Sequence, residues 1–186
     1  MPERLLSFDP GAERCGWCVL ERDGKRFKNK PPEKLGLGFF GIPRQPNKSS
    51  KKTDFQPYRL SLLDLWIEQT PILLERYEPD EIVSEIIPPV GGGNFVVATQ
   101  SHLALCAITC VQTVSKQHGI PVHQIGATTV KTKIGGNKKA TKVAVRNGVF
   151  KIMPKLEDYK KEWTKIFDVS DAVAIGLAHW GYKNGK

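Results

Sequence analysis

Four acidic side chains in this sequence could together hold divalent metal ions. Asp9 ends the apolar run "RLLSF", and Glu85 lies inside the apolar run "IVSEII". Asp168 and Asp171 lie three residues apart in "FDVSDAVAIGLAHW", so on a helix they would share one face of the first turn. Carboxylate oxygens suit Mg²⁺ or Mn²⁺, and two such ions about 4 Å apart can clamp the attacking and leaving oxygens of a phosphodiester.

Most of these acids could have a structural role instead of binding a metal. Asp9 could accept hydrogen bonds from the backbone amides of a turn. Asp168 or Asp171 could cap the helix, which would explain one aspartate and leave the other. Glu85 is harder to explain in this way, because a glutamate in a strand that is apolar on both faces needs a charged partner or a metal. Taken together, the acids favour a metal site.

The C-x-x-C formed by Cys15 and Cys18 raises the alternative of zinc binding or thiol–disulfide exchange. It falls across the start of an expected strand, where residues three apart lie about 10 Å from each other. Two thiolates on one zinc ion lie within about 4.6 Å. A redox C-x-x-C also needs a helix N-terminus, which this pattern lacks. We therefore predict neither chemistry, and we interpret Cys106 and Cys110 as core side chains.

Basic residues indicate a polyanionic partner. The 186 residues include 28 Lys and Arg against 19 Asp and Glu, for a net charge of +9. One basic cluster surrounds Gly135-Gly136-Asn137, where free backbone amides before a helix can also bind phosphate. Solvated surface lysine is the alternative interpretation. We predict DNA contacts for the cluster, which consists of Lys131, Lys133, Lys138, Lys139, Lys142 and Arg146. The histidines, in contrast, show no ligand spacing.

The elements that must position these residues alternate between strands and helices. Pro71 should kink or split the first helix, and residues 43–56 and 154–167 are predicted to be a mobile basic loop and an insertion. This order predicts one α/β domain over 1–186, with a mixed sheet between helices. No leader or membrane-spanning run is evident, which favours a cytoplasmic protein with no membrane partner. The expected strands are 4–8, 16–21, one within 35–42, 81–87 and 120–126, and the expected helices are 57–77, 95–118, 140–152 and 168–182.

These segments, in this order, resemble the RuvC family of Holliday junction resolvases, within the RNase H-like superfamily. "FDPGAERCGWCVL" is similar to the first family motif, and "DEIVSEIIPP" is similar to the second. "ATTVKTKIGGNKKATKVAVRNGVFKIM" resembles the segment with two DNA-contacting lysines eleven residues apart, here Lys131 and Lys142. "DVSDAVAIGLAHW" is similar to the closing helix with its D-x-x-D-A. The resemblance runs through nearly the whole chain.

The resemblance implies a five-stranded mixed RNase H-like sheet whose first three strands are antiparallel. It implies that Asp9 bridges two Mg²⁺ ions, for which Mn²⁺ can substitute, that Glu85 holds one, and that Asp168 with Asp171 holds the other. It further implies a homodimer that cuts four-way DNA junctions by paired symmetric nicks. The products would carry 5′-phosphate and 3′-hydroxyl ends.

Other implied roles concern DNA contact and dimerisation. Lys142 would lie near the scissile phosphate, and Lys131 would hold the DNA backbone. Family members usually place a stacking aromatic just after the second acid, where this chain reads "IIPPVGGGN"; we expect Phe95 to take that place. The helix at 95–118 is the candidate dimer interface. The longer segments at 43–56 and 154–167 are more typical of a phage or other mobile-element relative.

Three further functions remain as alternatives. The first is a general nuclease for branched DNA, and the second is an RNase H-like nuclease that acts on RNA. The third is a non-catalytic DNA-binding module. The two-lysine segment and the D-x-x-D favour DNA over RNA, and four clustered carboxylates argue against a non-catalytic module. The sequence identifies no helicase or packaging partner and no cleavage preference.

Overall fold

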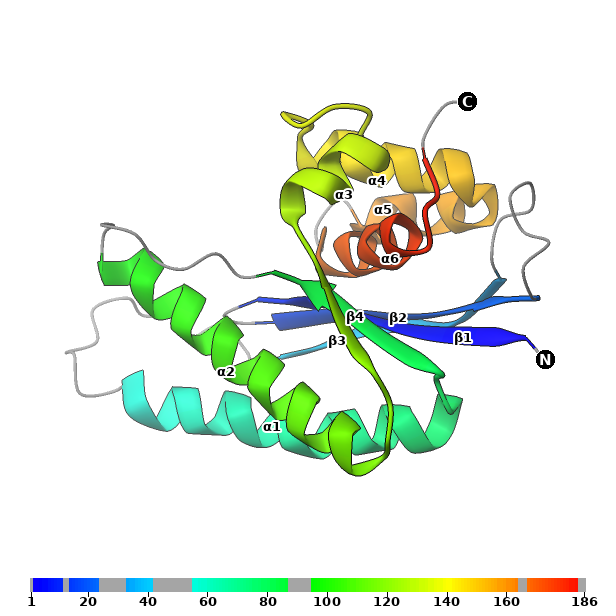
Figure 1. Ribbon diagram of the computed structural model, residues 1–186. Coiled ribbons are helices and arrows are strands. Elements are labelled where there is room, and N and C mark those ends of the chain that lie inside the picture. Colours follow the sequence, from blue (N-terminus) through cyan, green and yellow to red (C-terminus); the bar gives the residue numbers. More distant parts are fainter. Residues whose placement is uncertain are drawn as a thin grey trace.

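A computed structural model describes residues 2–11, 14–23, 33–41, 55–86, 95–163 and 167–183, with side chains from 63 in the first helix and from 104 in the second. A five-stranded sheet lies between two layers of helices (Figure 1). The strands follow the order β3-β2-β1-β4-β5. Their bounds are β1 Glu3–Pro10, β2 Arg14–Arg22, β3 Glu33–Gly41, β4 Glu81–Glu85 and β5 Val122–Ile125.

Strand directions make the sheet mixed. β1, β2 and β3 are antiparallel neighbours, whereas β4 runs parallel to both β1 and β5. The predicted five-stranded mixed sheet with three antiparallel leading strands is therefore confirmed. Because β1 and β4 are parallel, their carboxyl ends meet at the same edge of the sheet.

Helices cover both faces of the sheet. On one face lie α1 (Phe55–Tyr77) and α2 (Phe95–Gln117); the other face carries the remaining helices (Figure 1). No helix in the described ranges is both long and apolar enough to span a bilayer. The helices of the second layer are α3 (Ala127–Lys133), α4 (Lys142–Ile152), the 3₁₀ segment η3 (Pro154–Tyr159), α5 (Lys160–Trp163) and α6 (Phe167–His179).

Strand alternation divides the apolar side chains into two cores, one beneath each helical layer. Cys18 is buried in the core that contains α6, and Cys15 is buried in the core that contains Trp66 of α1. The two thiols therefore lie on opposite faces of the sheet, as the strand pattern predicts, and both cysteines are free. Burial raises the pKa of both thiols, which disfavours the thiolate that redox or zinc chemistry requires. Cys106 and Cys110 are each partly buried.

Pro71 was expected to kink or split the first helix, and the split is wrong because the helix is continuous. α1 continues from Phe55 to Tyr77 with Pro71 inside it. Trp66 on one side of the proline and Leu73 with Leu74 on the other are buried in the same core. Packing of both halves against one sheet face outweighs the backbone hydrogen bond that proline removes.

Candidate active site at the carboxyl ends of β1 and β4

Two of the predicted acids lie at the carboxyl ends of neighbouring strands. Phe8 of β1 pairs with Ser84 of β4, so Asp9 and Glu85 follow at the same edge of the sheet. Both face α6: the hydroxyl of Ser7 donates to the carbonyl of Ala172 in α6 (2.8 Å), and residues two apart on a strand share a face. The same alternation places Glu85 on the face of Val83, which is buried with α6.

The first turn of α6 brings the other two acids to this edge. Asp9 pairs with Gly16 across the β1–β2 ladder. A Cβ atom on Gly16 would overlap the backbone carbonyl of Asp168. The missing side chain therefore lets the start of α6, with Asp168 and Asp171, rest on β2 beside Asp9. This contact explains why the D-P-G-x-x-x-x-G motif needs its second glycine.

Mutual repulsion shows that the acids form one electrostatic cluster. Burial raises the pKa of Asp9 well above its ordinary value, and the charges of Asp171, Glu85 and Asp168 raise it further. Burial and then Asp171 raise the pKa of Glu85. The pKa of Asp171 is also raised, mainly by burial and in part by Asp168. A site that disfavours its own negative charges in this way is one that a cation would stabilise.

Two of the predicted lysines lie beside these acids. Nζ of Lys142 is 2.8 Å from Oδ2 of Asp171. Lys142 begins α4, where the hydroxyl of Thr141 caps the helix by accepting from the backbone amide of Ala144 (3.2 Å). The positive charge of Lys131 lowers the pKa of Asp171 and of Glu85, although burial outweighs this effect at both. The eleven-residue spacing thus places both lysines near the carboxylates.

The donor set fits divalent cations. Oδ2 of Asp168 is buried and accepts no hydrogen bond from any described residue; Nε of Arg14 lies 3.3 Å from it. Arg14 therefore pairs with this buried carboxylate, and a bound cation would add to that compensation of its charge. Because all four side chains offer only oxygen, the hard ions Mg²⁺ and Mn²⁺ match them better than metals that prefer imidazole or thiolate.

The remaining residues predicted to bind DNA lie in different surroundings. Lys138 and Lys139 are exposed in the turn between α3 and α4. The amine of Lys133 donates to the carbonyl of Ala178, at the opposite end of α6 from Asp168. Arg146 is not on the predicted basic surface: it is 7% exposed, with its guanidinium 5.4 Å from the ring centre of Phe167. DNA contact by these four basic residues stays a prediction.

Two other predicted features fall outside the described side chains. Phe95 begins α2, but its side chain is not among those described. Residues 42–54, which hold most of the predicted basic loop, also lie outside the described ranges. Of the predicted insertion at 154–167, the described part consists of η3, α5 and the first residue of α6.

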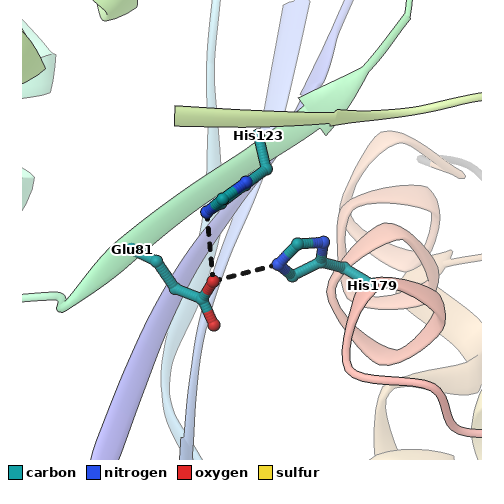
Figure 2. Close-up of side chains that lie close together, drawn as sticks. All are labelled: Glu81, His123 and His179. Carbon is teal, nitrogen blue, oxygen red and sulfur yellow. Dashed lines mark hydrogen bonds and ion pairs between the residues drawn. The ribbon is translucent and has the colours of Figure 1, made fainter. Parts of the chain in front are cut away.

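A second polar cluster lies at the other end of β4. Glu81 of β4, His123 of β5 and His179 of α6 bring one ligand atom each to within 4.8 Å of the others (Figure 2). Among the described residues, no other three His, Cys, Asp or Glu side chains converge so closely. Sequence spacing could not reveal this cluster, because its members come from three elements far apart in the chain.

The strand order, the helices on both faces and the acidic edge define an RNase H-like domain. Thermus thermophilus RuvC has this fold, with a TM-score of 0.68 at 20% identity over 95% of this chain and 92% of that one. The yeast mitochondrial Holliday junction resolvase Ydc2 shares it at a TM-score of 0.54 and 14% identity, over 95% of this chain and 77% of that one.

A family model confirms the narrower assignment. The model described as crossover junction endodeoxyribonuclease RuvC matches residues 5–179, so the chain belongs to the RuvC family. Crossover junction endodeoxyribonuclease RuvC of Gluconobacter oxydans is 26% identical over 95% of this chain and 89% of its own length. The Sulfurovum sp. enzyme of the same name is 28% identical over 94% and 93%. The predicted family is confirmed.

Proposed function

We propose that this protein is a Mg²⁺-dependent endonuclease that resolves four-way DNA junctions by paired symmetric nicks. The convergence of Asp9, Glu85, Asp168 and Asp171 at one sheet edge, in a chain of the RuvC family, carries this proposal. Thermus thermophilus RuvC in complex with a Holliday junction substrate has the same fold, with a TM-score of 0.67 at 18% identity over 95% of this chain and 92% of that one. The net charge of +9 suits a polyanionic substrate. Such an enzyme would act in the cytoplasm, where its DNA lies.

Each carboxylate has a distinct place in the proposed site. Asp9 is influenced by the charges of all three other acids and would share two cations, Glu85 would hold one, and Asp168 with Asp171 would hold the other. When bound, divalent cations supply activation of the attacking water and neutralisation of the leaving 3′ oxygen. Asp9 and Glu85 lie on paired strands of the sheet, so the backbone fixes their separation before substrate arrives.

Lys142 and Lys131 would act on the phosphate rather than on the metal. The ammonium group of Lys142, held at Asp171, lies at the edge of the acidic cluster, where it can offset the negative charge that develops on the phosphate. Lys131 would contact the DNA backbone from α3, and Lys138 and Lys139 would extend that contact along the exposed turn.

Homodimerisation is part of the proposal, because two cuts in a nearly two-fold symmetric junction require two sites. The layer of α1 and α2 exposes apolar side chains that a second copy could cover: Ile67, Ile72 and Leu105 are each about half exposed. Sedimentation analysis should give a dimer. Replacing these three side chains by charged ones should give monomers that have lost paired cutting.

The direct test uses a labelled immobile four-way junction, incubated with Mg²⁺, with Mn²⁺ or with EDTA. Paired nicks in opposing strands that require a metal and are lost in Asp9→Asn would support the proposal. A fork, a flap and a linear duplex serve as comparison substrates. Equal cutting of forks and flaps would replace junction selectivity with general debranching, and cutting of structured RNA alone would favour the RNA nuclease. Tight junction binding without cleavage would indicate a non-catalytic module.

A further inference from the structure

The cluster of Glu81, His123 and His179 lies outside the catalytic acids and has the composition of a transition-metal site. Nε2 of His179 is 3.0 Å from Oε2 of Glu81, and Nε2 of His123 is 3.5 Å from the same oxygen. Figure 2 shows both imidazole rings directed at the carboxylate, one from β5 and one from α6. The two ring centres are 5.0 Å apart.

These distances are close to what one metal ion requires. Zinc binds imidazole nitrogen and carboxylate oxygen at about 2.0–2.2 Å, so ligand atoms around it in tetrahedral geometry lie about 3.3–3.5 Å apart. The three ligand atoms already lie within 4.8 Å of one another. The two histidine–glutamate distances are already near this spacing, and the two imidazole nitrogens need to approach each other by at most about 1.5 Å to admit an ion, with a fourth position left for water.

A second layer of contacts fixes the carboxylate. The indole N–H of Trp180 donates to Oε1 of Glu81 (2.6 Å), which leaves Oε2 for the histidines. Metal ligands are commonly oriented by such outer hydrogen bonds. His179 and Trp180 thus contact different oxygens of the same carboxylate. Two cations lie nearby, but both are engaged: Lys133 donates to the carbonyl of Ala178, and Arg22 pairs with Glu3.

Access and position are also suitable. The side chain of His123 is 45% exposed, so an ion can enter from solvent, whereas Glu81 and His179 are each 21% exposed. Glu81 and Glu85 lie at opposite ends of β4, about 13 Å apart along the strand. The two clusters therefore share no ligand.

We propose that Glu81, His123 and His179 form a binding site for a divalent transition metal ion of the Zn²⁺ class. Imidazole favours Zn²⁺ and Co²⁺ over Mg²⁺, so this site and the oxygen-only catalytic site select different metals. A bound ion would join the end of α6 to β4 and β5 and would stabilise the fold. The proposal does not depend on the nuclease activity.

The test begins with full-length protein that has been treated with EDTA and dialysed. Zn²⁺ should raise its Tm by about 5–10 °C at a hundredfold excess over Kd, given the size of the domain. His123→Gln should abolish most of this rise, and because the side chain is exposed the variant should fold. His118→Gln, which changes an exposed histidine after α2, is the matched control and should retain the full rise.

Cobalt spectroscopy separates this site from the catalytic acids. Co²⁺ in a tetrahedral site with two imidazoles should give strong visible absorption bands at one ion per chain, and an Asp9→Asn/Glu85→Gln variant should retain them. Loss of the bands in that variant, or their persistence in His123→Gln, would overturn the proposal. So would a Zn²⁺-induced Tm rise that is equal in His123→Gln and His118→Gln, or no rise at all. Junction cleavage bears only on the proposed function, so the two proposals can fail separately.

Discussion

The backbone carbonyl of Asp168 occupies the space in which a side chain of Gly16 would stand. Gly16 is also the register partner of Asp9 across the first hairpin. One strand position therefore positions two acids. Gly16 pairs with Asp9 near the end of β1, and it contacts Asp168 in the first turn of α6. The spacing between Asp9 and Gly16 in the sequence is thus a geometric requirement of the acidic site.

Gly16→Ala should lower both stability and activity. The added methyl group forces α6 away from β2, and overpacking of this kind costs about 1–3 kcal/mol of unfolding free energy. Urea denaturation measures this loss, and Mg²⁺-dependent cleavage should fall further because Asp168 moves. Gly126→Ala is the control: a Cβ atom there would meet only the hydroxyl of Thr129, at an ordinary van der Waals distance of 4.0 Å, so this variant should lose much less stability than Gly16→Ala. Equal stability of the two variants would contradict the seating contact.

Asp9→Asn should stabilise the metal-free protein while it abolishes cleavage. Burial and three neighbouring carboxylates raise the pKa of Asp9. A neutral side chain at this position therefore removes a buried negative charge that its neighbours repel. Scanning calorimetry in EDTA should give a higher Tm for the variant. Mg²⁺ should raise the Tm of the wild type more than that of Asp9→Asn. An equal Mg²⁺ effect on both proteins would argue against cation binding at Asp9.

The metal-free protein should become more stable as pH falls from 8 towards 5. The pKa values of Asp9, Glu85 and Asp171 are raised above 3.8, 4.5 and 3.8, so the folded state binds more protons than the unfolded state. The stability that this extra proton binding contributes is fully present below the ordinary pKa values. It is lost as pH rises through the raised pKa values. Glu81 has the opposite effect, because its pKa is lowered from 4.5. The stability that Glu81 contributes is lost only as pH falls through that lowered pKa.

Thermal melts in EDTA across this pH range test the prediction, with Asp9→Asn/Glu85→Gln as the comparison. The wild-type Tm should rise on acidification, the variant should respond less, and saturating Mg²⁺ should flatten the wild-type profile. A Tm that falls steadily from pH 8 to pH 5 in the metal-free wild type would contradict the prediction.

Lys142→Met should reduce cleavage by about 10²–10³-fold, the usual cost of losing one group that stabilises developing charge. It should also lower the Tm of the metal-free protein, because Asp171 loses the ammonium 2.8 Å away. Single-turnover cleavage at saturating Mg²⁺ measures the first effect. Lys139→Met, in the exposed turn, should weaken junction binding while leaving the single-turnover rate of bound substrate unchanged. Equal losses of the single-turnover rate in the two variants would indicate that Lys142 only contacts DNA and does not assist cleavage.

Thiol reactivity should distinguish the two cysteine pairs. Cys15 and Cys18 are fully buried, whereas Cys106 and Cys110 are partly exposed. Burial raises the pKa of Cys15, Cys18 and Cys110, so access rather than pKa separates the two pairs. A thiol reagent should label Cys106 and Cys110 in the native protein, and Cys15 and Cys18 only after unfolding. Cys15→Ser should retain nuclease activity. Rapid native labelling of Cys15, or loss of cleavage in Cys15→Ser with an unchanged Tm, would revive a thiol-based role.

Local pattern predicted a mixed sheet between helices and pointed to the four acids, whereas the three antiparallel leading strands followed from the family resemblance. Strand alternation correctly separated Cys15 from Cys18, and the acids lie on elements whose ends the apolar runs define. The split expected at Pro71 does not occur, because the effect of a proline in a helix depends on the tertiary packing on both sides of it. Arg146 is buried for a similar reason, since charge alone does not reveal which face of α4 meets the core. The Glu81 cluster needed three-dimensional pairing of β4, β5 and α6.

The ion pair between Lys142 and Asp171 links two binding events. Without ligands, the two side chains pair with each other. In the bound state, the carboxylate would bind a cation and the ammonium group would bind a phosphate. A cation that takes Asp171 frees Lys142, and DNA that takes Lys142 frees Asp171. Each ligand should therefore raise the affinity for the other by the same factor. Such reciprocity would keep the cations weakly held until a junction is bound, so that the hydrolytic centre assembles on its substrate.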